Sequence, residues 1–135
     1  MAYKIAAIEG IGPVLGEKLK LAGIKTVEQL LEKGCDKKGR KTLATATGLS
    51  EKKVLVFVNN ADLFRIKGVS SQYAELLKAA GVDTVKELRN RKPENLYQKM
   101  IEVNQSKKLV RQPPYLKQVQ KFVAFAKELD PKVTY

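Results

Sequence analysis

Apolar side chains recur at helical spacing along most of this chain. In residues 54–61 they follow the 0, 3, 4, 7 spacing of one helix face, at Val54, Phe57, Val58 and Ala61. Taken alone, the five apolar residues 54–58 also fit a buried strand. A second copy removes this ambiguity, because residues 119, 122, 123 and 126 repeat the pattern 65 residues later, whereas Leu55 and Val56 align with Gln120 and Lys121. We therefore predict a helix in both places.

Proline, glycine and capping residues predict where the other helices begin and end. Pro13 suits the first position of a helix, and Gly23 and Gly81 suit the position just after a helix end. The segments Thr26-x-x-Gln29 and Thr84-x-x-Glu87 both fit the capping box that starts a helix. Further helices are predicted before Gly48, after Ser50, from Pro93, and after Pro113-Pro114 to about Leu129. No strand is required, so the predicted fold class is all-α.

The chain contains an internal repeat. Ile8–Leu30 aligns with Ile66–Leu88 at an offset of 58 residues, with identities that include Gly10/Gly68, Leu19/Leu77 and Gly23/Gly81. The later helix aligns at an offset of 65, so we expect seven extra residues in Arg89–Pro93 or Ser106–Pro114. We predict two tandem repeats, residues 1–65 and 66–135. Because the linker between them has no flexible Gly/Ser stretch, we expect them to be tightly coupled as one compact helical unit.

Each repeat opens with a tight hairpin that leads into a helix. Gly10 can adopt backbone angles closed to other residues, and Ile11 can turn inward to anchor the loop. Backbone N–H groups then point outward from a helix N-terminus, which attracts an anion such as a phosphate. The candidate main-chain donors are Gly10, Ile11, Gly12, Gly68, Val69 and Ser70. The candidate cations beside them are Lys18, Lys20, Lys67 and Lys78.

The first hairpin resembles the helix-hairpin-helix motif, apolar-x-Gly-apolar-Gly-x-x-x-small-x-x-apolar. Its defined positions are filled by Ile8, Gly10, Ile11, Gly12, Gly16 and Leu19. The resemblance implies binding to the sugar-phosphate backbone through main-chain N–H groups, without reading bases.

A wider resemblance is carried by residues 8–13, 47–50 and 61–69, and it extends over residues 4–129. Across that range the chain is similar to an uncharacterised bacterial family of tandem helix-hairpin-helix proteins, a domain of unknown function. In shape, such repeats also resemble the sterile-alpha-motif-like helical class. The resemblance therefore implies the fold and leaves the activity open.

The two hairpins differ in ways that affect anion binding. Glu9 lies beside the first hairpin and would repel a phosphate, whereas Lys67 takes the same place in the second. Ser70 replaces the second glycine and is expected to cap its own helix, which would use N–H groups that a phosphate needs. Glu17 and Glu75 are expected near the first helical turns, where they would compete with an external anion.

Charge makes a polyanion the leading class of partner. The 135 residues include 26 Lys and Arg against 14 Asp and Glu, a net charge of +12. Three basic clusters could extend a binding site: Lys37, Lys38, Arg40 and Lys41; Arg89, Arg91 and Lys92; Lys107, Lys108 and Arg111. Each cluster also fits an exposed loop that charge keeps soluble.

The amino-acid composition excludes several common classes of catalytic and metal site. One cysteine, Cys35, and no histidine exclude an internal disulfide, a Cys/His zinc site and a nucleophile–histidine pair. Residues 34–42 nearly spell a nucleotide-binding phosphate loop, but Arg40 interrupts it and a helix is predicted where that loop needs a strand. Neither a membrane span nor a secretory signal is recognisable, so we expect a cytoplasmic location. We expect no catalytic residue, metal or cofactor.

These observations favour a non-catalytic protein that binds double-stranded DNA or structured RNA. Tyr73 is the one aromatic residue near either hairpin in sequence, which argues against a base-stacking surface and for duplex backbone. The alternative is a helical interaction or adaptor module, with a protein partner or a homodimer and no nucleic-acid binding. An apolar patch on a neutral face would favour that alternative.

Overall fold

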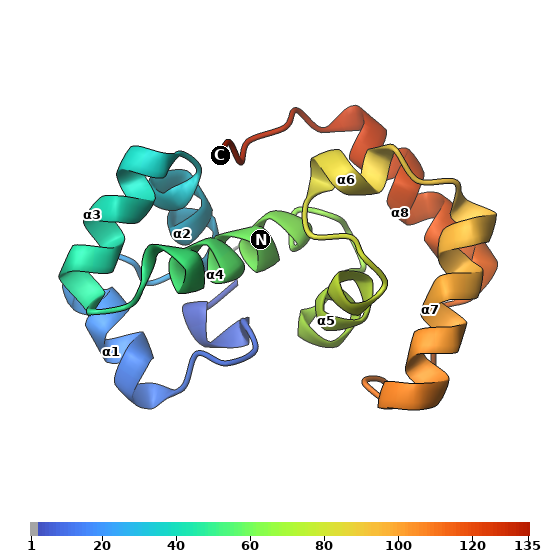
Figure 1. Cartoon of the computed structure of the whole chain (residues 1–135), viewed down its shortest axis with the longest axis horizontal. Coiled ribbons are helices and arrows are strands. Elements are labelled where there is room, and N and C mark those ends of the chain that lie inside the picture. The colour runs from blue at the N-terminus through green and yellow to red at the C-terminus, as the bar shows by residue number, and fades with distance from the viewer. Residues whose placement is uncertain (1–2) are drawn as a thin grey trace. The chain divides into compact units, whose positions relative to one another are not determined.

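A computed structural model describes residues 3–135, and it confirms the all-α prediction (Figure 1). The elements are η1 (Ile5–Ala7), α1 (Pro13–Leu21), α2 (Val27–Gly34), α3 (Lys37–Thr47), α4 (Glu51–Leu63), α5 (Ser71–Ala79), α6 (Val85–Arg89), α7 (Pro93–Lys107) and α8 (Leu116–Glu128). Within the described residues, extended pairing is limited to an isolated antiparallel bridge between Lys4 and Thr26. Among these same helices, none has the length and apolar composition needed to cross a bilayer.

The described chain divides into two compact units. The first contains residues 3–62 and the C-terminal residues 132–135, and the second contains residues 63–131. The C-terminal residues join the first unit through a backbone hydrogen bond in which Thr134 N donates to Cys35 O at 2.8 Å. Tight coupling of the two repeats stays a prediction.

In the first unit, α2 packs against α3, and η1 packs against both α1 and α2. Its core is apolar, with Ile8, Ile24, Val27, Leu30 and Val58 at 0–1% exposure. The predicted face of α4 is buried at all four positions, whereas Leu55 and Val56 are only half-buried. The helical interpretation of residues 54–61 is therefore correct.

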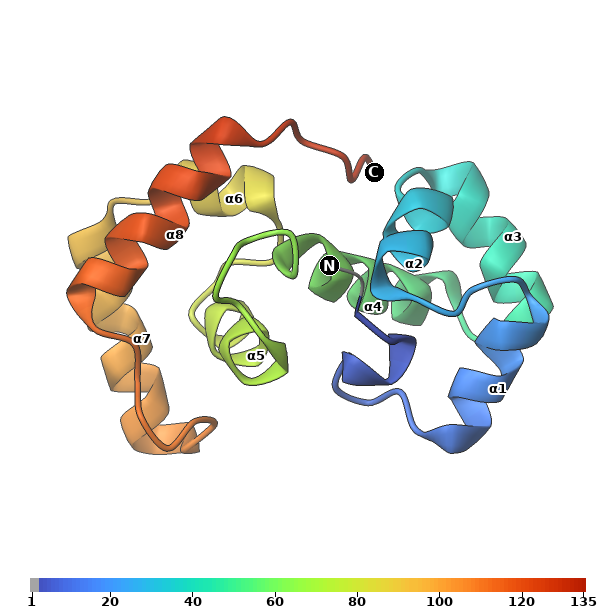
Figure 2. The same ribbon diagram turned by 180° about the vertical axis from the view of Figure 1, so that it is seen from behind.

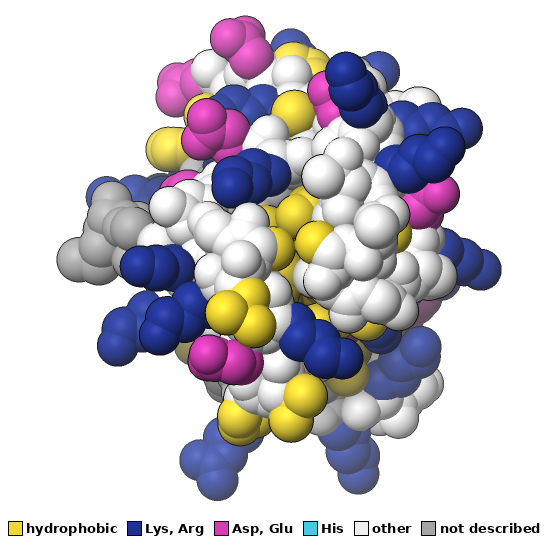
Figure 3. Space-filling view, turned by 90° about the vertical axis from the view of Figure 1, so that its left-hand side faces the viewer, with side chains coloured by type: hydrophobic (Ala, Val, Ile, Leu, Met, Phe, Trp, Pro, Cys, Tyr) yellow, Lys and Arg dark blue, Asp and Glu magenta, His cyan; other side chains and the backbone are white. Residues whose placement is uncertain are grey.

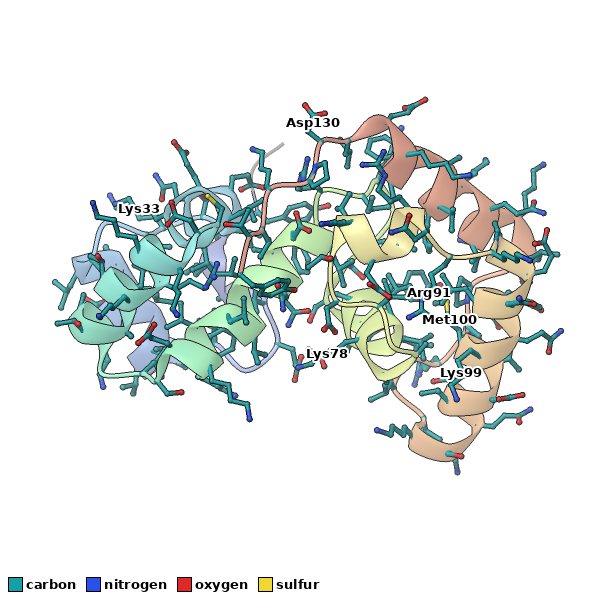
Figure 4. All side chains as sticks on the ribbon, turned by 45° about the horizontal axis from the view of Figure 1, so that its top comes forward. Lys33, Lys78, Arg91, Lys99, Met100 and Asp130 are labelled. Carbon is teal, nitrogen blue, oxygen red and sulfur yellow. The ribbon has the colours of Figure 1, made fainter. Side chains whose placement is uncertain are left out.

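In the second unit, α8 lies alongside α7 and contacts α6, while α5 packs against α7 (Figures 1 and 2). The face of α8 that repeats the α4 pattern is buried, and Gln120 and Lys121 are exposed. On α7, Met100 is fully buried and lies on the inner side of the helix, while the neighbouring Lys99 is exposed and points outward (Figure 4). The core of this unit is therefore closed by side chains from all four of its helices.

Most helix ends follow the predicted capping chemistry. Thr26 and Gln29 form a complete capping box, and Ser50 Oγ accepts from Lys53 N at 3.1 Å. Thr84 Oγ1 accepts from Glu87 N at 3.2 Å, but the Glu87 carboxylate pairs with Arg91 at 2.9 Å. The second capping box therefore has the bond from Glu87 N to the Thr84 hydroxyl, while the Glu87 carboxylate is used by Arg91.

The extra residues of the second repeat lie in α7 and in the loop that follows it. α7 has 15 residues where α3 has 11, and residues 108–115 connect α7 to α8 where residues 48–50 suffice between α3 and α4. The starts of α6 and α7 are eight residues apart, whereas the starts of α2 and α3 are ten residues apart. Arg89–Pro93 therefore holds no insertion. Of the two predicted locations, only the later segment is correct.

Candidate functional site

The two hairpins share one backbone conformation. Gly10 and Gly68 both have φ +91°, a region that side chains rarely adopt. In the first hairpin, Ile11 N donates to Ile8 O at 3.2 Å, and in the second, Val69 N donates to Ile66 O at 3.1 Å. Both Ile11 and Val69 are buried, so they anchor their loops. Their N–H groups are already bonded within the hairpins, so neither amide is open to an external anion.

Four of the six proposed main-chain donors remain accessible. The residues Gly10, Gly12, Gly68 and Ser70 are exposed, and their amides have no acceptor among residues 3–135. The first helical turns add four more amides without an acceptor in the described chain, at the exposed Val14 and Gln72 and the half-buried Leu15 and Tyr73. These four were not predicted from the sequence, although the first amides of any helix lack an intrahelical partner.

One expected competitor for an anion, the Ser70 side chain, makes no capping bond. Ser70 is nevertheless the N-cap of α5. Its φ of −105° matches the ordinary extended backbone of Gly12, at φ −88°, so serine replaces glycine there without strain. Glu17 and Glu75 stand at the fifth position of α1 and α5, directly after the first turn, so their competition with an external anion stays a prediction.

The candidate lysines lie at different distances from the hairpin amides. All four are exposed, and Lys67 is adjacent to Gly68. Lys18 and Lys20 belong to the last turn of α1, and Lys78 to the last turn of α5. At about 1.5 Å per residue, Lys20 and Lys78 are about 10 Å along the helix axis from the hairpin ends. Lys67 is thus the cation that the structure brings closest to hairpin amides.

Arginines from two of the basic clusters have structural roles. Arg40 is 5% exposed, and its guanidinium donates to Gly34 O at 2.9 Å and to Thr134 O at 2.6 Å. Arg91 donates to Gly81 O at 2.9 Å and pairs with Glu87. Arg40 is therefore absent from the basic surface, whereas the Arg91 side chain stays 38% exposed but is partly neutralised by Glu87.

One face of the first unit can be inspected for a basic patch in Figure 3. On the face that carries α1 and α3, Lys and Arg side chains are scattered, with Asp and Glu between them and hydrophobic atoms at several places (Figure 3). Lys37, Lys38 and Lys41 are exposed on α3. This face therefore carries mixed charge rather than a continuous basic patch.

Phenylalanine rings pack against both hairpins, which the sequence analysis did not foresee. A methyl group added at Gly10 would lie 3.4 Å from Phe57 Cε1, and one at Gly68 would lie 3.2 Å from Phe122 Cε1. Phe122 also packs against Tyr73, with ring centroids 6.2 Å apart. Because both contacts join residues far apart in sequence, only the 65-residue match of Phe57 to Phe122 could have drawn attention to them.

The segment that nearly spells a phosphate loop is helical. Gly39 lies inside α3, and its amide donates to Asp36 Oδ1 at 2.7 Å, which caps the helix. Cys35 Sγ lies 3.4 Å from Glu32 O. Across residues 3–135, no group of three or more His, Cys, Asp and Glu side chains is placed to hold a metal ion.

The geometry defines an all-α protein in which the same hairpin, helix and phenylalanine arrangement occurs twice. Residues 9–129 match the family described as Domain of unknown function (DUF4332), and the chain belongs to that family. Comparisons with curated proteins and with solved structures gave no match. The family description assigns no activity, so a functional proposal depends on the hairpins.

Proposed function

We propose that this is a non-catalytic protein that binds the phosphate backbone of double-stranded DNA or structured RNA, with little sequence preference. One observation carries the proposal: two hairpins of similar backbone conformation each present exposed residues whose amides have no acceptor within the described chain. Such amides at a helix N-terminus suit phosphate oxygens, and a net charge of +12 supplies general attraction to a polyanion.

In this proposal each hairpin acts as a helix-hairpin-helix motif. α4 precedes the second hairpin, whereas the first is preceded by the three-residue η1. Lys67 adjoins the second hairpin, and Glu9 stands at the equivalent place in the first. The second hairpin is therefore the stronger phosphate site, and Lys18 is the nearer of the two proposed cations on α1.

A specific observation favours the alternative of a protein-interaction module. Val14 and Leu21 lie seven residues apart on one face of α1 and are 74% and 81% exposed. Exposed apolar side chains on one face are typical of interaction surfaces. Light scattering tests this alternative, which predicts that wild type is a dimer and that Val14→Ser/Leu21→Ser is a monomer.

Fluorescence anisotropy with duplex DNA, duplex RNA and single-stranded DNA at several salt concentrations tests the main proposal. For about four to six phosphate contacts, log affinity should fall against log salt with a slope of about −4 to −5. Lys18→Glu/Lys67→Glu should abolish duplex binding. The charge-matched control Lys99→Glu/Lys132→Glu, at exposed positions outside the hairpins, should retain it. Equal weakening in both variants, or no binding near physiological salt, would contradict the proposal.

A further inference from the structure

A groove of about 500 Å³ lies between the second hairpin and α8. Lys67 and Gly68 line it from the hairpin, and Gln118, Lys121, Phe122 and Phe125 line it from α8. Its volume is typical of sites that hold one small organic group. The groove therefore joins the stronger of the two proposed phosphate sites to an aromatic wall.

The two phenylalanines have different roles in this wall. Phe122 is 4% exposed and is held between Gly68 and Tyr73, so it forms a fixed floor. Phe125 lies one helical turn further along α8 and is only half-buried, so part of its side chain faces the groove. A partly exposed phenylalanine beside a basic loop is suited to stacking on a nucleobase.

The groove also has a charge gradient. Lys67 and Lys121 are exposed, and neither forms an ion pair with another residue of the described chain. Glu128 lines the groove seven residues beyond Lys121, about 10 Å further along the helix at 1.5 Å per residue. A phosphate is therefore favoured at the lysine end, and a second phosphate is disfavoured at the Glu128 end.

The first repeat lacks the residues that make this groove. Glu9 stands in place of Lys67, Val56 in place of Lys121, and Asn60 in place of Phe125. Lys53, which aligns with Gln118, places its Nζ 5.1 Å from the Phe57 ring centroid and so covers that ring. The combination of free cations and an accessible phenylalanine is specific to the second repeat.

We propose that this groove takes one unpaired nucleotide next to a duplex. Its base stacks on Phe125, and its phosphate lies at Lys67 and Lys121. The inference rests on the proposed binding of duplex backbone, and it adds a preference for duplexes with a single-stranded end or bulge over fully paired ones.

The test uses a blunt DNA duplex and the same duplex with one unpaired 2-aminopurine nucleotide, a fluorescent adenine analogue, at its end. Wild type should bind the second duplex at least about fivefold more tightly, and stacking should quench the 2-aminopurine fluorescence. Phe125→Leu keeps an apolar side chain but removes the ring, so it should abolish both effects. Its affinity for the blunt duplex should stay within about twofold of wild type. Lys121→Gln should reduce the preference, whereas Lys127→Gln, on α8 outside the groove, should not.

The outcomes separate the two proposals. Equal affinity of wild type for both duplexes, or an unchanged preference in Phe125→Leu, overturns the groove proposal and leaves backbone binding by the hairpins intact. If neither duplex binds near physiological salt, both proposals fail. Thermal unfolding of each variant checks that it folds. If Phe125→Leu does not fold, the preference for the unpaired nucleotide in Lys121→Gln, compared with that in Lys127→Gln, decides the result.

Discussion

Gly68 lies directly against the edge of the Phe122 ring, so an added methyl group would fit there only if the ring shifted by a few tenths of an ångström. An added methyl group would be 3.2 Å from Phe122 Cε1, and the backbone at Gly68 has φ +91°. Gly10 and Phe57 repeat this relationship in the first unit, with a distance of 3.4 Å. Glycine therefore suits the backbone conformation in both hairpins, and at Gly68 it also relieves a tight contact with the ring.

Gly10→Ala and Gly68→Ala should each lower the free energy of unfolding by about 1–2 kcal/mol, because a side chain is strained at positive φ. Gly68→Ala should have the larger effect, since Phe122 must also shift. Chemical denaturation measures both. Gly12→Ala is the control within the same loop: its φ is −88° and its added methyl group meets nothing within 4 Å, so stability should change little. A loss in Gly12→Ala equal to that in Gly10→Ala would contradict this account.

Arg40→Met should destabilise the first unit by about 1–3 kcal/mol, because it removes the donor of one buried and one part-buried hydrogen bond to carbonyl oxygens. The oxygens affected are Gly34 O, at the end of α2, and Thr134 O, in the C-terminal segment. Urea denaturation measures the loss, and faster amide exchange at Thr134 should accompany it, since its N–H bonds to Cys35 O.

The control for Arg40 is its neighbour Lys41, which is exposed on the same helix. Lys41→Met removes the same charge and should change stability by less than about 0.5 kcal/mol. If both variants lose equal stability, the charge rather than the buried hydrogen bonds is responsible.

Local signals explain why the helices could be predicted. The spacing of Val54, Phe57 and Val58 gives the buried face of α4, and Thr26 and Ser50 carry hydrogen-bonding groups that satisfy nearby amides. Each of these relationships lies within a few residues of sequence. The position of Ser70 was also predicted, but its hydroxyl does not cap the helix, because residue type gives the capacity for a bond and not its geometry.

Contacts between distant segments explain what could not be predicted. Arginine is usually a surface residue, yet Arg40 is buried because its guanidinium donates to Thr134 O, 94 residues away in sequence. Phe122 lies far from Gly68 in sequence, so the aromatic wall beside the second hairpin was missed. Four of the accessible amides, at Gly10, Gly12, Gly68 and Ser70, were predicted from local pattern, whereas the groove beside the second hairpin depends on how α8 packs.

Thr26→Ala should cost about 1 kcal/mol, because it removes the acceptor for Gln29 N and breaks a complete capping box. Ser70→Ala should cost much less, since the Ser70 side chain makes no capping bond. Thermal unfolding compares the two variants. A loss in Ser70→Ala as large as that in Thr26→Ala would mean that Ser70 caps α5 in solution and competes with phosphate after all.

Lys108→Gly should raise stability by about 0.5–1 kcal/mol. Lys108 ends α7 with φ +49°, the one positive φ outside glycine in the described chain, and glycine adopts that conformation without penalty. The buried Asn104 side chain holds the following loop in place, since it accepts from Val110 N at 3.0 Å and donates to Val110 O at 3.1 Å. This bond pair persists in Lys108→Gly, so the gain in stability measured by urea denaturation reports the relief of backbone strain.

The control is Lys107→Gly, one residue earlier and inside the helix, which should instead lose about 0.5–1 kcal/mol of stability. A gain in Lys107→Gly would mean that the loss of a positive charge, rather than the relief of strain, stabilises the protein.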